Sequence, residues 1–333
     1  MVADSCFLDW ELPESERDFE IIETHISYVI LTSRWAYKIK RSLSLPFLDF
    51  SQLEQRYHFC QKELALNQRL APQMYLSVLP VKKSNHQIYI GSGSGDTVDY
   101  ALKMKRMDNA LEMDRMLLTR TVNANHIGDL AAYLADFHAQ ATVVFPNYSL
   151  QYFQHLFNPI ADLFPYFQQY LGSKYSTIVE KAIQTSDQFL KSNMELLIQR
   201  QELGLVRDLH GDLHSKNIFL SQPPIIFDCI EFDNALRQID VLDEVAFLAM
   251  DLEAFGYFSL AQILYRQYLN RMASYQITQV DHSQLFTYYK MYRANVRAKV
   301  LAFQAQKSNQ AKKIRKEAKG YLDLMGQYST QLL

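Results

Sequence analysis

Residues 207–234 constrain the fold more than any other part of the chain, and they read RDLHGDLHSKNIFLSQPPIIFDCIEFDN. Asp212 lies in a polar loop, Asn217 lies five positions further on, and the apolar run 225–227 leads directly into Asp228. Turn formation alone explains Asp and Asn in a loop, because both side chains can bond their own backbone. It does not explain a second Asp at the end of a strand with a buried pattern. The segment therefore predicts a loop and a strand end that bring three oxygen-bearing side chains to one site.

This spacing indicates phosphoryl transfer. A loop carboxylate can accept the proton of an attacking hydroxyl, while an amide oxygen and a second carboxylate hold the magnesium ion that bridges the nucleotide phosphates. Protein kinases use the same order of an Asp, four residues, an Asn and a later Asp. We therefore expect Asp212 to be the catalytic base, and Asn217 and Asp228 to be the Mg²⁺ ligands.

Composition excludes several classes of protein. The 333 residues suffice for two lobes with a substantial shared core. The 34 Lys plus Arg nearly balance 36 Asp plus Glu, for a formal net charge of −2, so no nucleic-acid partner is expected. The three cysteines are scattered, which fits a reducing cytosol rather than a disulfide framework. Neither a signal-peptide core nor an apolar run of about 20 residues occurs, so we expect a cytoplasmic protein without a membrane partner.

Residues 19–45 alternate in the manner of three strands, broken by a short loop at 24–27 and a turn at 32–34. Ala36, Lys38 and Lys40 share one face of the third strand because side chains alternate with a period of two. A small residue two positions before a Lys is the pattern of the kinase strand whose Lys reaches the α and β phosphates. We therefore prefer Lys38 to Lys40 as the phosphate lysine. The alternative is an edge strand whose lysines face solvent. No GxGxxG loop joins these strands, so we expect the backbone of 24–27 to cover the phosphates.

Residues 51–70 predict a helix, capped by Ser51 with Glu54 three positions later. On this helix Glu63 is our candidate partner for the phosphate lysine, because an ion pair from a neighbouring helix fixes the reach of the lysine toward the phosphates. The alternative is an exposed Glu63 that pairs with Asn67 or with a nearby Lys.

Two segments near residue 100, residues 91–96 and 105–108, could be thought to contact the nucleotide. Residues 91–96, GSGSGD, lead into no helix, so a flexible hairpin turn between strands at 87–90 and 98–107 is preferred to a phosphate loop. We expect the chain to cross between lobes at 105–108. There the backbone groups of Arg106 and Met107 would bond adenine, since any residue supplies an N–H and a C=O.

Helical patterns replace strand alternation from residue 127 onward. Phe and Tyr are concentrated in 145–203, where a role in the core is favoured over stacking on a substrate. Only 12 positions separate Asp228 from Asp240, where a helix begins, and this leaves little room for the long activation segment on which protein kinases dock peptides. A small-molecule acceptor is therefore expected. The acidic residues between 231 and 251 could attract a cationic acceptor, although capping and pairing with arginines explain them equally well.

The chain from about residue 19 to 300 resembles the aminoglycoside phosphotransferase-like kinases. Within that superfamily it is most similar to an uncharacterised, mostly bacterial group, some members of which are fused to a P-loop kinase domain. The segments that carry this resemblance are ETHISYVIL, AYKIKR, FLDFS, RLAP, HGDLHSKNI, FDCIEF and IDVLDEVAFL. The sequence holds no GxxxxGK[ST] segment, so we expect a form without that second domain.

The resemblance implies an α+β, bilobal, protein-kinase-like fold. It would consist of a small antiparallel β lobe with one main helix, residues 1–107, and a larger helical lobe, residues 108–333. ATP and Mg²⁺ are the implied cofactors, and Lys38 with Glu63 would orient the phosphates. The expected activity is transfer of the ATP γ-phosphoryl group to a hydroxyl of a small molecule. The alternatives are a catalytically inactive nucleotide-binding regulatory module and a protein kinase.

Overall fold

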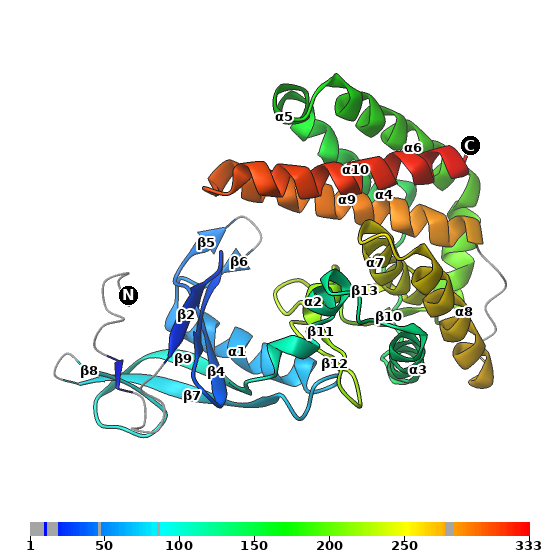
Figure 1. The fold of residues 1–333 in the computed structure, drawn as a ribbon. Coiled ribbons are helices and arrows are strands. Elements are labelled where there is room, and N and C mark those ends of the chain that lie inside the picture. The colour runs from blue at the N-terminus through cyan, green and yellow to red at the C-terminus, as the bar shows by residue number, and fades with distance from the viewer. Residues whose placement is uncertain (1–9, 12–18, 46–47, 85–86, 277–282) are drawn as a thin grey trace. The chain divides into compact units, whose positions relative to one another are not determined.

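The computed structural model describes residues 10–11, 19–45, 48–84, 87–276 and 283–333 (Figure 1). The chain divides into two compact units. The first unit comprises Met1–Arg115 and Asn217–Asn234, and the second comprises Met116–Lys216 and Ala235–Leu333. This division differs from the boundary at residue 107 that the sequence suggested, because the segment 217–234 groups with the strands of the first unit.

The first unit is built on a seven-stranded sheet with the order β1-β8-β7-β9-β4-β3-β2. Its pairings are antiparallel except for β1 with β8. The three strands expected between residues 19 and 45 are confirmed as β2, β3 and β4. The strands of the sheet are β1 (Trp10–Glu11), β2 (Glu20–Glu23), β3 (Ser27–Leu31), β4 (Trp35–Lys40), β7 (Tyr75–Ser84), β8 (Gln87–Ile90) and β9 (Asp96–Lys105), and a separate short pair joins β5 (Ser44–Leu45) to β6 (Leu48–Asp49).

The period of two in β4 divides its side chains between two apolar clusters. Tyr37 and Ile39 are buried in one cluster with Ile30 of β3. Ala36 is buried in the other, which includes Leu102 of β9. Lys38 and Lys40 follow Ala36 at intervals of two, so they lie on its face of the sheet, and this is the face that can present charge to a ligand.

Helix α1 (Leu53–Asn67) is the main helix of the first unit and contacts β7 and β9. The predicted cap at Ser51 is wrong. The N-cap position is Gln52, which makes no side-chain cap. Ser51 instead donates its backbone N–H to Asp49 Oδ1 at 2.9 Å, so it belongs to the preceding turn.

The glycine-rich segment 91–95 is not a hairpin turn between β8 and β9. Both of these strands pair with β7, which lies between them in the sheet. The segment therefore crosses from one side of β7 to the other. The sequence pattern predicted strands close to β8 and β9 and a turn between them. It did not predict that β7 would pair between these two strands.

A short hairpin ties the segment 217–234 to the first unit. Strand β11 (Ile218–Phe219) pairs antiparallel with β12 (Ile225–Ile226). Phe219 and Ile225 join the apolar cluster of Ala36. Leu220 also donates its N–H to the Leu111 carbonyl at 2.8 Å. Apolar burial and backbone pairing together place this hairpin with the sheet.

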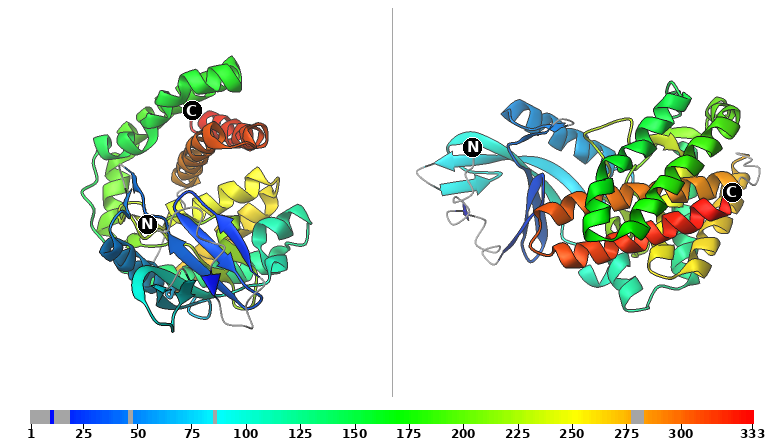
Figure 2. Two further views of the ribbon diagram at one scale, coloured as in Figure 1. Left: turned by 90° about the vertical axis from the view of Figure 1, so that its left-hand side faces the viewer. Right: turned by 90° about the horizontal axis from the view of Figure 1, so that it is seen from above.

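The second unit is helical apart from the pair β10 (Val206–Asp208) and β13 (Gln238–Asp240). Helices α9 and α10 lie side by side (Figure 2). Among the described residues, no helix combines the length and the apolar character needed to cross a membrane. The helices that lie in this unit or reach it are α2 (Met113–Leu118), α3 (Ala124–Gln140), α4 (Leu150–Phe157), α5 (Phe164–Tyr170), α6 (Ser173–Glu202), α7 (Val241–Ala254), α8 (Phe258–Ser274), α9 (Ser283–Lys307) and α10 (Ala311–Gln331).

The crossing segment generates a stability prediction at Gly95. Its φ is +116°, and an added Cβ would lie 2.2 Å from the Lys83 carbonyl oxygen. We expect Gly95→Ala to lower the free energy of unfolding by about 1–3 kcal/mol, the cost of a strained backbone position, as measured by urea denaturation. Gly320→Ala is the control, because a Cβ there meets nothing within 4 Å and alanine favours the helix by up to about 1 kcal/mol. Equal stability of the two variants would contradict the prediction.

Candidate functional site

Lys38 lies between two carboxylates of the first unit. Its Nζ is 2.8 Å from Glu63 Oε1 on α1 and 2.6 Å from Asp228 Oδ1 after β12. The Lys38 side chain is 13% exposed and that of Asp228 is 48% exposed. The strand, the helix and the segment after the hairpin thus meet at one ammonium group that solvent can still reach.

Lys40 lies deeper in the same cluster. Its Nζ contacts Glu63 Oε2 at 2.6 Å and Glu231 Oε1 at 2.5 Å. Its side chain is only 1% exposed, and the ammonium lies over the Phe50 ring at 4.9 Å. The side chains therefore alternate in charge, in an arrangement that we call the ion network: Asp228, Lys38, Glu63, Lys40 and Glu231. Of the two lysines, Lys38 is the one that can reach a ligand, whereas Lys40 is enclosed.

Mutual attraction keeps the central groups of the ion network charged. Burial raises the pKa of Glu63, but the two lysine charges outweigh it and lower that pKa to about 2. Burial lowers the pKa of Lys38, but Asp228 and Glu63 outweigh it and raise that pKa well above its ordinary value. Lys38 is therefore a cation and Glu63 an anion at neutral pH.

The backbone holds Asp228 in an unusual conformation. Its φ is +64°, in the left-handed region that few residues other than glycine adopt. Its N–H donates to the Tyr75 hydroxyl at 3.1 Å, and the next N–H, of Cys229, donates to Asn67 Oδ1 at 2.9 Å. Bonds to β7 and to the end of α1 thus stabilise a strained turn that carries a half-exposed carboxylate. Strain of this kind is common at functional sites.

The hairpin register brings the backbone of Asn217 close to the residue before Asp228. Ile218 pairs with Ile226, and the Asn217 carbonyl accepts the Phe227 N–H at 3.0 Å. Asn217 therefore lies opposite the residue that precedes Asp228. A carboxylate and an amide oxygen are hard donors that fit Mg²⁺, which commonly takes one or two protein carboxylates and completes its shell with phosphates and water. The described residues contain no cluster of three or more His, Cys, Asp or Glu that could hold a metal by themselves.

The candidate adenine segment follows β9. The Arg106 N–H already donates to the Arg34 carbonyl at 2.9 Å, and its guanidinium Nη1 donates to the Thr32 carbonyl at 2.6 Å. Met107 packs, partly buried, against the apolar cluster of Ala36. Arg106 is thus fixed to the turn before β4. The backbone groups still available to bond adenine are the carbonyl of Arg106 and the N–H and carbonyl of Met107.

The loop that carries Asp212 is held by the start of α7 within the second unit. Glu244 Oε1 accepts the N–H of His210 at 2.8 Å and that of Gly211 at 2.7 Å. Arg293 donates to the Gly211 carbonyl at 3.2 Å and pairs with Asp243 at 2.7 Å. Charge-assisted bonds of this kind are about twice as strong as neutral ones, so the loop backbone is rigidly held.

Asp212 itself is ionised. Its Oδ2 lies 3.4 Å from His214 Nε2, and its side chain is 38% exposed. Desolvation raises the pKa of Asp212, but His214, Arg297 and His210 outweigh it and hold the pKa well below the ordinary value. The carboxylate is therefore an anion at neutral pH, as a proton acceptor must be. Its role as the base stays a prediction.

Sequence reasoning missed the partners that hold these candidates. Glu231 is the second carboxylate on Lys40, and not merely one of the acidic residues between 231 and 251. Glu244, another of these acidic residues, accepts two loop amides and also contacts His138 Nε2 at 2.8 Å. The sequence offers one indication of the role of Glu231. Glu231 follows Asp228 by only three positions, so a segment that brings Asp228 to the lysines can also bring Glu231 to them.

Comparisons with known proteins show what this architecture is similar to. No family model matches the chain. Uncharacterised proteins of Mycobacterium tuberculosis and Mycobacterium bovis are 28% identical over 296 residues, which is 86% of this chain and 56% of theirs. The chain thus spans little more than half the length of these relatives.

Solved structures match over nearly the whole chain. A choline/ethanolamine kinase family protein from Mesorhizobium loti aligns with a TM-score of 0.54 and 13% identity, covering 96% of this chain and 93% of that one. The chain has a protein-kinase-like fold. An amicoumacin kinase in complex with AMP-PNP, Ca²⁺ and Ami aligns with a TM-score of 0.51 and 14% identity, over 94% of this chain and 89% of that one. The expected α+β kinase-like fold class is therefore confirmed.

The ion network of this kinase-like fold predicts different effects at its two lysines. Lys40→Met leaves Glu63 Oε2 and Glu231 buried without their cation, so we expect a loss of about 3–5 kcal/mol in the free energy of unfolding. Lys38→Met leaves Glu63 paired with Lys40 and Asp228 hydrated, so we expect a loss of about 1 kcal/mol or less. Urea denaturation measures both. Comparable losses would show that the two lysines do not differ in this way.

A second prediction concerns acid stability. The pKa of Glu63 is lowered from 4.5 to about 2 in the folded protein. Between those values the unfolded chain binds more protons at this site, so its stabilising contribution is complete above about pH 4.5 and declines as pH falls. We expect Glu63→Gln to flatten the fall in unfolding free energy between about pH 4.5 and pH 3, measured by urea denaturation. Glu54→Gln, at an exposed residue of the same helix, is the matched control. If the unfolding free energy of Glu63→Gln falls with pH as steeply as that of the wild-type protein, the pKa of Glu63 is not lowered in the folded state.

Proposed function

We propose that this protein is an ATP-dependent phosphotransferase that moves the γ-phosphoryl group to a hydroxyl of a small molecule. The observation that carries the proposal is the Lys38 ammonium, held between buried Glu63 and half-exposed Asp228. An accessible, permanently charged lysine fixed by a helix carboxylate next to a strained Asp is the arrangement that orients nucleotide phosphates in kinases.

Lys38 would bind the α and β phosphates, and Glu63 would keep its ammonium in place. Asn217 and Asp228 would hold Mg²⁺, which supplies positive charge to the phosphates when bound. The backbone bond from Phe227 to Asn217, which places the residue before Asp228 opposite Asn217, supports this pairing. The carbonyl of Arg106 and the N–H of Met107 would bond adenine, since the N–H of Arg106 is already used.

Asp212 would accept the proton of the acceptor hydroxyl. The hydroxyl oxygen forms a bond to the γ phosphorus, the bond from that phosphorus to the β,γ-bridging oxygen breaks, and its electron pair leaves with ADP. An anionic Asp212, held on a rigid loop, serves such a step by position rather than by strong basicity. Five positions separate it from Asn217, a span of at most about 17 Å.

A small acceptor is supported by the segment that follows Asp228. Strand β13 begins at Gln238, and α7 begins at Val241. The intervening residues are too few for a platform that docks a peptide. The two structural neighbours described above are, by their names, a choline/ethanolamine kinase family protein and an amicoumacin kinase.

Asp212→Asn tests the proposal directly. The variant keeps the shape of the side chain but removes its negative charge, so we expect turnover to fall by about 10²–10⁴-fold with an unchanged melting temperature. The assay is Mg²⁺-dependent transfer from labelled ATP to a cell extract of small molecules, read by mass as a gain of one phosphate. Asp129→Asn, at an exposed position of α3, is the control. Wild-type turnover in Asp212→Asn would overturn the assignment of the base.

A further inference from the structure

Arg297 of α9 lies in the charged surroundings of Asp212 within the second unit. It is one of the groups that lower the pKa of Asp212. Its side chain is 11% exposed, and its Nη2 lies 3.7 Å from Glu317 Oε1. Its Nε has no hydrogen-bond partner among the described residues, and neither does His214 Nδ1. Leaving a buried polar atom unpaired costs about 1–3 kcal/mol. Two such atoms, on residues in the charged surroundings of one candidate base, indicate a ligand that the protein is built to bind.

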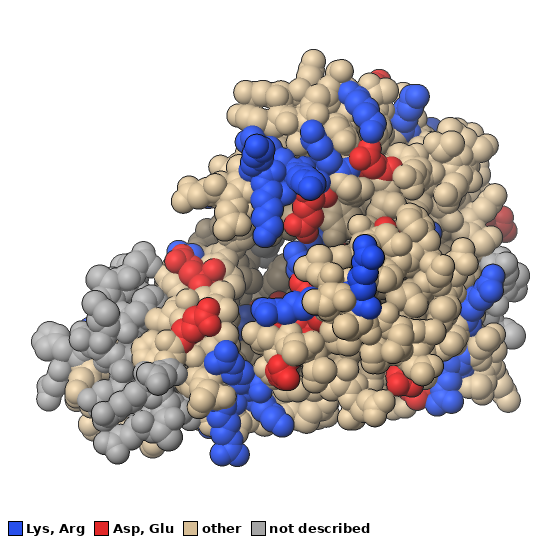
Figure 3. All heavy atoms as spheres, in the orientation of Figure 1, with Lys and Arg blue, Asp and Glu red and all other residues tan. Residues whose placement is uncertain are grey.

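Further cations continue from Arg297 along α10. Glu317 Oε1 also lies 3.4 Å from Lys216 Nζ, four positions after Asp212 in the chain. Lys313 precedes Glu317 by one helical turn and therefore lies on the same face of α10. We call the set of Arg297, Lys216, Lys313 and Lys316 the basic strip. Figure 3 shows Lys and Arg side chains gathered over the start of α10.

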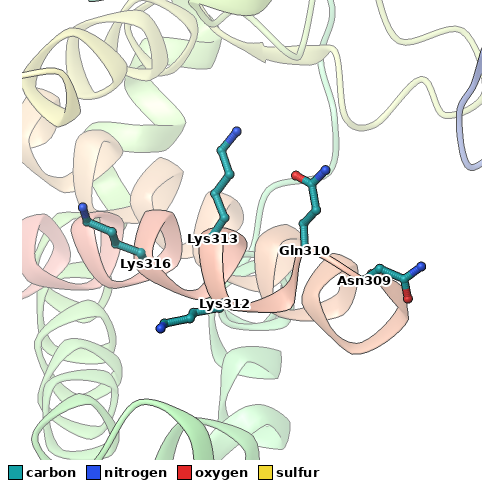
Figure 4. Close-up of a pocket in the computed structure, with 5 residues that line it drawn as sticks. All are labelled: Asn309, Gln310, Lys312, Lys313 and Lys316. Carbon is teal, nitrogen blue, oxygen red and sulfur yellow. The ribbon is translucent and has the colours of Figure 1, made fainter.

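Lys313 and Lys316 of the basic strip line an open hollow of about 510 Å³. This size falls in the range of small-molecule sites, about 300–1,000 Å³. Lys313, Lys316 and Gln310 extend to the same side of α10 (Figure 4). The residues that line the hollow are Asn309, Gln310, Lys312, Lys313 and Lys316.

The acids at residues 240–253, which could have bound a cationic acceptor, are already engaged. The segment 240–253 carries most of the acids near α7, and each has a partner within the second unit. Arginine and lysine partners neutralise three of these carboxylates, and a tyrosine hydroxyl and a histidine ring occupy oxygens of the other two. The pairs are Asp240 with Arg200 at 2.6 Å, Asp243 with Arg293 at 2.7 Å, Glu244 with His138 at 2.8 Å, Asp251 with Tyr321 at 2.9 Å and Glu253 with Lys290 at 2.8 Å.

We propose that the acceptor carries an anionic group as well as the reacting hydroxyl, and that the basic strip binds this group, with Arg297 nearest to Asp212. The inference rests on the proposed phosphotransfer and names its substrate class: a small hydroxy compound that bears a carboxylate or a phosphate. Arg297 suits this role because its planar guanidinium matches both of these oxyanions. The lysines of α10 add long-range attraction.

Fractionated extract tests the substrate class. Small molecules from cells are separated by ion exchange into anionic, neutral and cationic fractions, and each is incubated with the protein, Mg²⁺ and labelled ATP. We expect a gain of one phosphate in the anionic fraction. Transfer confined to the neutral or cationic fraction would overturn this inference and leave the proposed function standing. Transfer in none of the three would overturn both.

Once the fractionated extract has identified an acceptor, variants test whether the basic strip binds it. For the double variant Lys313→Ala/Lys316→Ala we expect KM for the acceptor to rise about tenfold, the equivalent of about 1.4 kcal/mol, with KM for ATP and kcat unchanged. Wild-type KM should rise with ionic strength, and the double variant should lose much of that dependence. The exposed pair Lys181→Ala/Lys191→Ala on α6 is the matched control. If Lys313→Ala/Lys316→Ala keeps the KM for the acceptor and the salt dependence of the wild-type protein, the basic strip does not bind the acceptor.

Discussion

The structure of the first unit depends on one buried carboxylate, that of Glu63, between two ammonium groups. A lone charge in this position would cost several kcal/mol, so Glu63 needs a buried cation. Lys40 supplies it, and Lys38 contacts the second oxygen of Glu63. This requirement joins β4 to α1 and, through Asp228 and Glu231, both of them to the segment after the hairpin. Three parts of the chain that are distant in sequence are thereby held at one point.

The second unit applies the same principle to a loop. Glu244 is buried and accepts two backbone amides next to Asp212, while Arg293 joins that loop to Asp243. Because α7 is buried from Val241 to Leu252, its acids must be neutralised by partners. The acidic cluster that could have bound a cationic substrate is instead a structural device that orients the candidate base.

The charged residues of this kinase-like fold therefore fall into two groups. In each unit, paired charges hold the structure together, and charges that are less fully paired are the ones available to a ligand. Lys38 has the accessibility that a nucleotide phosphate requires, and Arg297 retains an unpaired donor near Asp212. The fold alone does not choose the acceptor, since similar scaffolds carry unrelated functions. The exposed lysines at the start of α10, together with the incompletely paired Arg297 of α9, supply a reason to propose an anionic one.

The sequence alone determined what is local: the alternation of β2, β3 and β4, the helix that carries Glu63, and the spacing of Asp212, Asn217 and Asp228. These follow from a period of two, a period of 3.6 and fixed numbers of residues. Only the tertiary structure decided that β7 separates β8 from β9, that Lys40 is enclosed and Lys38 accessible, and that Glu231 and Glu244 are partners rather than free acids. Those facts depend on which distant segments share a buried environment, and a local pattern does not specify the partner of a charge.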